Sequence, residues 1–100
     1  MADGIQLARA ASLAALATDG VHSLGRGRFV EAATYEGGEK VSGVVVSPDE
    51  VAVHIVARYP LPRPIPEIVR DIVERVAPEA GGRRTTVVVE DLEVADDERL

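Results

Sequence analysis

One apolar segment, residues 51–59 (VAVHIVARY), constrains the fold of this chain more than any other. A run of β-branched and apolar residues of this length, with turn residues on both sides, is typical of a buried central strand. Alternate side chains of a strand point to opposite faces of the sheet. The segment therefore predicts two faces, with Val53, Ile55 and Ala57 on one and Ala52, His54, Val56 and Arg58 on the other.

Two shorter β-rich segments precede this run. Residues 29–35 predict one strand and residues 41–47 a second, and the glycines in residues 36–40 favour a hairpin turn between them. Residues 47–50 (SPDE) predict another tight turn, because proline suits its first corner position. We therefore expect an antiparallel meander of three strands that ends with residues 51–59.

Two helices are expected. The first covers residues 4–18, with Asp3 as N-cap and Gly20 at the left-handed position that ends a helix. Its apolar side is expected to contain Ile5, Ala8, Ser12, Ala15 and Leu16, with Leu13 close by.

Four alternating prolines in residues 60–66 exclude helix and ladder pairing and indicate a stiff crossover. Pro66 suits the first position of the second helix, which covers residues 67–77. The apolar residues of this helix recur with helical spacing at Ile65, Ile68, Val69, Ile72, Val73 and Val76. A last strand is expected at residues 83–92, which completes a strand–helix–strand unit with residues 51–59.

These elements predict an α+β fold, a two-layer sandwich with the order α-β-β-β-α-β. We expect a mostly antiparallel four-stranded sheet with both helices on one face. One hundred residues fit one domain, which we assign to residues 1–92. Residues 93–100 are acidic, lack apolar periodicity and are expected to fray as a C-terminal tail.

Catalytic and metal-binding motifs are missing from the sequence. There is no cysteine, which excludes disulfides and thiolate metal sites and fits a reducing interior. There is also no nucleophile elbow, dinucleotide fingerprint or pair of histidines at metal-ligand spacing. We therefore expect no enzyme activity, no catalytic residue, no cofactor and no metal.

His54 has two interpretations. A histidine among valines can be a pH switch or a metal ligand, or it can be a polar residue on the more exposed face of the sheet. The second is favoured, because no other histidine or carboxylate lies at ligand spacing in the same strand.

Four arginines in two loops form a possible anion contact: Arg26, Arg28, Arg83 and Arg84. The segment Gly25-Arg26-Gly27-Arg28 is either a flexible anion-binding loop or a connector with solvated arginines. The formal net charge of −6 argues against general affinity for nucleic acid, which needs clustered cations. A small nucleic-acid-binding module that uses these arginines is the alternative function.

Two stretches, residues 17–24 (ATDGVHSL) and residues 51–59, resemble elements of the alkaline shock protein family, the envelope stress response proteins of Gram-positive bacteria. The order of the following linker, helix and closing strand is also similar, so the chain resembles a short, divergent member. The resemblance implies a non-enzymatic scaffold protein that self-associates and binds a membrane-anchored partner at the cytoplasmic membrane face.

The chain shows no signal peptide and no apolar run near the ~20 residues that span a bilayer. We therefore expect a cytoplasmic protein without direct membrane insertion, held at the inner membrane face through its partner. It is expected to be a homo-oligomer and to contact other copies through one face of the sheet, either the face that contains Val30, Ala52, His54 and Val56 or the opposite one.

Overall fold

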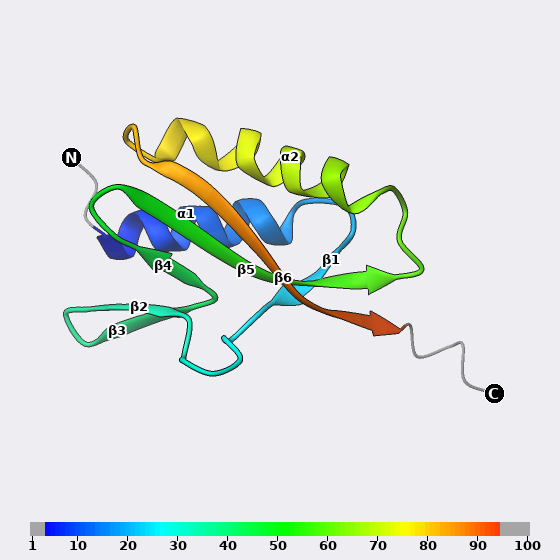
Figure 1. The fold of residues 1–100 in the computed structure, drawn as a ribbon. Coiled ribbons are helices and arrows are strands. Elements are labelled where there is room, and N and C mark those ends of the chain that lie inside the picture. Colours follow the sequence, from blue (N-terminus) through cyan, green and yellow to red (C-terminus); the bar gives the residue numbers. More distant parts are fainter. Residues whose placement is uncertain (1–3, 95–100) are drawn as a thin grey trace.

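The computed structural model describes residues 4–94 and shows an α+β fold with two helices, a mixed sheet and a separate two-stranded sheet (Figure 1). The elements, in chain order, are α1 (Gly4–Leu16), β1 (Val21–Leu24), β2 (Ala33–Glu36), β3 (Glu39–Ser42), β4 (Val44–Val46), β5 (Glu50–Tyr59), α2 (Ile65–Val76), the 3-10 turn η1 (Ala77–Glu79) and β6 (Arg84–Val94).

Strand β5 is the centre of the mixed sheet, as its sequence predicts. β6 runs parallel to it from the Glu50–Arg84 pair to the Tyr59–Val94 pair. Strands β1 and β4 are antiparallel to β5 and lie against its C-terminal and N-terminal halves respectively. Because β6 occupies one edge of β5 along its whole length, β1 and β4 share the other edge end to end. The backbone of His54 bridges them, bonding to Gly25 and Gly43 at 2.7 Å each.

The sheet differs from the prediction in three respects. It is mixed rather than mostly antiparallel, because β5, α2 and β6 form the expected strand–helix–strand unit with parallel strands. Residues 21–24 form a short strand that was not predicted, because four residues with little apolar–polar alternation give no clear strand pattern. The predicted strand at residues 41–47 is divided at Gly43, which has a φ of 90° and lies too close to Leu24 for any side chain.

The three-strand meander is therefore wrong in detail. β2 and β3 pair as the expected hairpin, but they form a sheet of their own. The first predicted strand begins at Ala33 instead of Phe29, because residues 28–32 belong to a loop. The side chain of Thr34 links this hairpin to β4, since its Oγ1 donates to the Val44 carbonyl at 2.7 Å and accepts from the Val46 amide at 3.2 Å.

The core lies between the helices and the inner face of the sheet, formed by the side chains of Val51, Val53, Ile55 and Ala57. Both helices contribute to the same buried cluster, with Leu7, Ala8, Ala11 and Ala15 from α1 and Ile68, Ile72 and Val76 from α2. Their placement on one face agrees with the prediction. The opposite side of the sheet, with Ala52, His54, Val56 and Arg58 of β5, is called the outer face below.

The buried side of α1 agrees with the prediction only in part. Leu16 was placed on the apolar side with Leu13 close by, but both side chains are exposed, at 50% and 63%. Ile5, Ala8 and Ala15 are buried as predicted, and Leu7 and Ala11 are buried in addition, so that small residues let this helix approach the sheet closely. The predicted N-cap Asp3 lies outside the described residues. The amide of Ile5 donates to the carboxylate of Glu36 at 3.1 Å, so β2 supplies an anionic acceptor at this helix terminus.

The last strand ends two residues later than predicted, at Val94 instead of Leu92. Glu93 and Val94 pair with Arg58 and Tyr59 as the last residues of β6. The remainder of the predicted tail, residues 95–100, lies outside the described residues.

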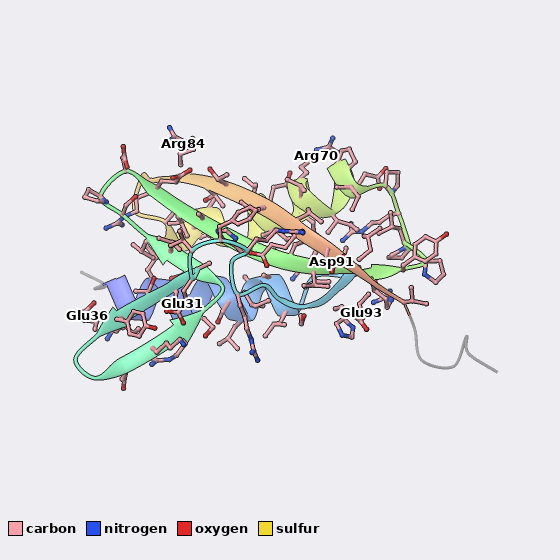
Figure 2. All side chains as sticks on the ribbon, turned by 60° about the horizontal axis from the view of Figure 1, so that its bottom comes forward. Glu31, Glu36, Arg70, Arg84, Asp91 and Glu93 are labelled. Carbon is pink, nitrogen blue, oxygen red and sulfur yellow. The ribbon has the colours of Figure 1, made fainter. Side chains whose placement is uncertain are left out.

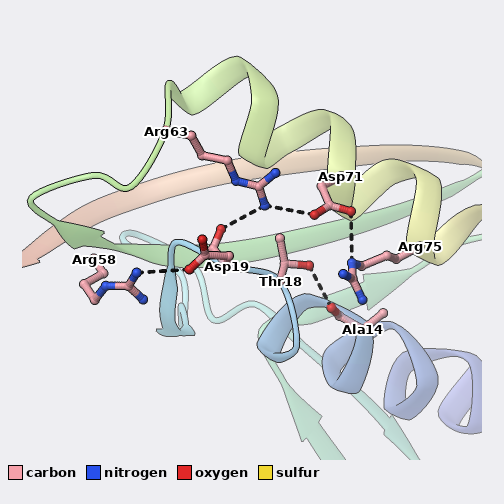
Figure 3. Close-up of polar contacts among 7 residues, drawn as sticks. All are labelled: Ala14, Thr18, Asp19, Arg58, Arg63, Asp71 and Arg75. Carbon is pink, nitrogen blue, oxygen red and sulfur yellow. Dashed lines mark hydrogen bonds and ion pairs between the residues drawn. The ribbon is translucent and has the colours of Figure 1, made fainter.

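A network of hydrogen bonds and ion pairs links the proline-rich crossover to α2 and to the turn that follows α1 (Figure 3). Arg63 donates to the Asp19 carbonyl at 3.0 Å and to Asp71 Oδ2 at 2.8 Å. Arg75 donates to the other oxygen of Asp71 at 2.9 Å. The Arg63 guanidinium, helped by Arg75, holds the pKa of the Asp71 carboxyl below its usual value, although partial burial opposes this shift.

This network predicts a pH-dependent contribution to stability. A carboxyl whose pKa is lower in the folded chain stabilises the fold above its unfolded pKa of about 3.9 and loses this effect as pH falls through the folded value. We expect Asp71→Asn to be less stable than the wild type at pH 7 and the difference to shrink below about pH 4. Urea unfolding at several pH values measures this, with Glu74→Gln on the exposed side of α2 as the control. A difference that does not change with pH would contradict the assignment.

Candidate functional site: the bulge, the glycine loop and the outer face

The most distinctive polar site in the described chain is at a β-bulge in β6. Ile55 pairs with Val89 and Val56 pairs with Asp91, so Glu90 has no partner in β5. A bulge of this kind changes the direction of a side chain and raises the local twist of the strand. Here it directs the carboxylate of Glu90 onto the outer face, next to His54.

The carboxylate of Glu90 receives contacts from three polar groups. The Arg26 amide donates to Oε1 at 3.2 Å, and the Gly27 amide donates to Oε2 at 2.8 Å. His54 Nδ1 lies 2.7 Å from Oε2. The Glu90 side chain is only 9% exposed and that of His54 19%. Since an ionised carboxylate can only accept hydrogen bonds, this contact places a proton on Nδ1 and leaves Nε2 for other contacts.

The glycine loop, residues 25–28, is an anion-binding segment whose anion belongs to the same chain. Consecutive backbone amides that converge on a carboxylate form a nest of the kind that binds anions. A Cβ at Gly25 would lie 2.4 Å from Glu90 Oε1, so only glycine permits this approach. Gly27 has a φ of 91°, and a Cβ there would lie 2.0 Å from the Val30 carbonyl. Both glycines are therefore required for the loop to close around Glu90.

The structure does not bring the four candidate arginines together. Arg26 and Arg28 both belong to the glycine loop, and Arg28 donates to the Glu90 carbonyl at 2.7 Å. Arg83 donates to the carbonyls of Ser47 and Ala80 at the start of β6. Arg84 lies six residues before Glu90 in β6, a distance of about 20 Å along a strand. The pair Arg26 and Arg28 therefore lies far from the pair Arg83 and Arg84, and the four side chains do not form one anion site.

The loop after these glycines displays two apolar side chains on the surface. Phe29 is 98% exposed and Val30 is 81% exposed. Their backbone is held on both sides, because the Ala32 amide donates to the Arg26 carbonyl at 2.8 Å and Ala32 itself is buried. The apolar tip is therefore part of a fixed loop.

A shallow hollow of about 350 Å³ lies between this tip and the sheet. It is lined by Arg28, Phe29, Val30, His54, Val88, Val89 and Glu90. A second hollow of about 340 Å³, on the other side of Glu90, is lined by Val56 and the glycine loop. We call Phe29, Val30, His54 and Val88 the apolar patch.

The predicted interaction residues all lie on this side of the molecule. Val30 and His54 line the first hollow, Val56 lines the second, and Ala52 is half-buried on the same face of β5. The sequence analysis missed Phe29 as a displayed residue and Glu90 as the partner of His54. Glu90 is 36 residues from His54 in sequence and lies in an acidic stretch, so only the bulge reveals its role.

Comparisons of the chain with protein-family models, with curated proteins and with solved structures found no match. Within residues 4–94, no three histidine or acidic side chains gather as a metal site. Neither helix of the described chain has the length and apolar character that crossing a membrane requires.

Proposed function

We propose that this protein is a non-enzymatic scaffold that self-associates and binds partner proteins through the apolar patch. The observation that carries this proposal is the exposure of Phe29 and Val30 on a loop fixed by Glu90. Buried aromatic side chains dominate the energy of protein interfaces. A fixed loop loses little conformational entropy when it binds, so more of the contact energy contributes to affinity.

The chemistry around the patch supports binding over catalysis. His54 and Glu90 form the one histidine–carboxylate pair among the described residues, and Glu90 is occupied by the loop amides as well. The residues around the hollow are mainly apolar, with no hydroxyl nucleophile among them. This composition suits the side chains of another protein.

The resemblance to envelope stress response proteins suggests where in the cell this scaffold acts. We propose that a membrane-anchored partner holds the protein at the cytoplasmic membrane face. The nucleic-acid alternative has less support, because the arginine pairs lie apart and the net charge is −6.

Sedimentation velocity over a wide concentration range tests this proposal. We expect the wild type to exceed the monomer mass as concentration rises. Phe29→Ser should weaken this association about 30-fold, the effect of a hot-spot residue worth about 2 kcal/mol. Leu13→Ser is the matched control, since Leu13 is also exposed but lies on α1, away from the outer face.

A wild type that stays monomeric at every concentration would overturn self-association. Equal weakening by Phe29→Ser and Leu13→Ser would show that the apolar patch is not the contact surface.

A further inference from the structure

The outer edge of β6 is unpaired in the described chain. β6 has eleven residues, and β5 is the one strand that pairs with it within residues 4–94. Its first half, before the bulge, keeps a regular register with β5. The Arg84 amide points toward β5, because it donates to the Asp49 carbonyl at 3.0 Å. Successive backbone groups of a strand point to opposite edges, so Thr85, Val87 and Val89 direct theirs to the open edge.

This edge lacks the usual protection against pairing. Natural edge strands are blocked by proline, lysine, bulges or covering segments. Residues 85–89 (TTVVV) contain neither proline nor lysine, and the bulge begins only at Glu90. They are all β-branched and only partly buried or exposed. A segment of this kind pairs readily with another strand.

The charges of β6 determine which strand fits. Arg83 and Arg84 lie at one end, whereas Glu90, Asp91 and Glu93 lie toward the other. Figure 2 shows Arg84 far from Asp91 and Glu93 along this strand. An antiparallel copy of β6 would bring each basic end to an acidic end, and a parallel copy would oppose like charges. Opposite charges on facing residues stabilise a strand pair, and like charges destabilise it.

We propose that β6 pairs antiparallel with β6 of a second copy of this chain, about a two-fold axis at Val87. This inference rests on the proposed self-association and specifies one of its contacts. The backbone directions require Thr85, Val87 and Val89 to form the hydrogen-bonded positions, and the match of Arg84 with the acidic bulge at Glu90 then sets the axis at Val87. Thr85 then faces Val89 of the other copy, and Val87 faces its own equivalent.

The same register places β-branched side chains opposite each other and the charges in complementary positions. On the outer face, Thr86 lies opposite Val88 of the second copy. Arg84 reaches the bulge at Glu90 and Asp91, where the exposed Asp91 is available for an ion pair. A two-fold contact of this type is closed, because the same surface is used by both copies. Val88 of the apolar patch takes part in this contact, whereas the exposed tip of Phe29 and Val30 remains open for others.

Single cysteines test the register, because the natural chain has none. The Thr86–Val88 position is a non-hydrogen-bonded antiparallel pair, with Cα atoms about 4.5 Å apart, within disulfide range. Copies with Thr86→Cys mixed with copies with Val88→Cys should form the mixed disulfide in high yield under mild oxidation. Each variant alone should cross-link poorly, since identical positions are about 7–8 Å apart on the diagonal.

Charge exchange gives a second, independent measurement. In the Phe29→Ser background, where association through the apolar patch is weakened, a dimer should remain in sedimentation velocity. Arg84→Glu should weaken this dimer at least about tenfold, a loss of ~1.4 kcal/mol. Adding Asp91→Arg should recover most of the affinity. Circular dichroism of each variant confirms that the comparison is between folded chains.

The outcomes separate the two proposals. A wild type that is monomeric throughout would overturn both. Association that depends on Phe29, without a preferred mixed disulfide and without an effect of Arg84→Glu, would overturn the strand pairing alone. Equal disulfide yields from Thr86→Cys alone, Val88→Cys alone and the mixture of both would indicate random collision. This result would also overturn the strand pairing. If the mixed disulfide is preferred and Phe29→Ser forms oligomers of the same mass as the wild type, the strand pairing is supported. The main contact would then lie at β6 and not at the apolar patch.

Discussion

Replacing Glu90 with alanine is expected to lower the free energy of unfolding by about 2–4 kcal/mol. The change removes the common acceptor of the Arg26 amide, the Gly27 amide and His54 Nδ1. A buried donor left without its partner costs about 1–3 kcal/mol, and hydrogen bonds to a charged acceptor lie at the upper end. Water can replace Glu90 as the partner of the more exposed Arg26 amide. The total loss of stability is therefore expected to be smaller than the sum of the costs for the three donors.

Urea unfolding measures this effect, and Glu93→Ala provides the control. Glu93 is an exposed glutamate in the same strand, so its replacement should change stability by no more than about 0.5 kcal/mol. Glu90→Gln should fall between the two, because the amide oxygen can still accept one set of hydrogen bonds without the charge. Equal stability losses in the alanine variants of Glu90 and Glu93 would refute the role of the carboxylate as the anchor of the loop.

Gly27→Ala is expected to destabilise the protein by about 3 kcal/mol or more. Two costs combine at this position. A φ of 91° is unfavourable for any residue with a Cβ. The added Cβ would also lie 2.0 Å from the Val30 carbonyl and 2.7 Å from the Ala32 amide nitrogen, and both are backbone atoms that cannot rotate away.

Gly38→Ala separates these two costs. Gly38 has a φ of 82° in the hairpin turn between β2 and β3, but no atom lies within 4 Å of the position of its Cβ. This variant should lose only about 1–2 kcal/mol from backbone strain. Chemical denaturation of both variants gives the comparison, and a loss for Gly38→Ala as large as that for Gly27→Ala would contradict the close packing of the loop.

These two predictions link the stability of the glycine loop to the proposed function. Glu90 and Gly27 do not form the apolar tip themselves. They fix the backbone that displays Phe29 and Val30, which makes them positioning residues for this surface. We therefore expect Glu90→Gln, the milder of the two Glu90 variants, to weaken self-association while the protein stays folded at room temperature.

The local patterns of the sequence determined much of the fold. β5 lies where residues 51–59 predict a strand, with the inner and outer side chains on the expected faces. α2 buries Ile68, Ile72 and Val76 as its spacing predicts. Both successes have the same physical reason, because the 2.0 and 3.6 periods of strand and helix are set by each segment's own backbone.

The tertiary structure alone decided how these segments combine. Nothing local to residues 21–24 or 44–46 shows that these short strands share one edge of β5, since that arrangement depends on β6 filling the other edge. The exposure of Leu13 and the burial of Ala11 follow from how α1 rests on the sheet. The glycines at positions 25 and 27 indicated an unusual loop, but the carboxylate that it encloses lies more than 60 residues later. A pairing over that distance is selected by the register of β6 against β5 and by its single bulge, and neither is encoded within one segment of the chain.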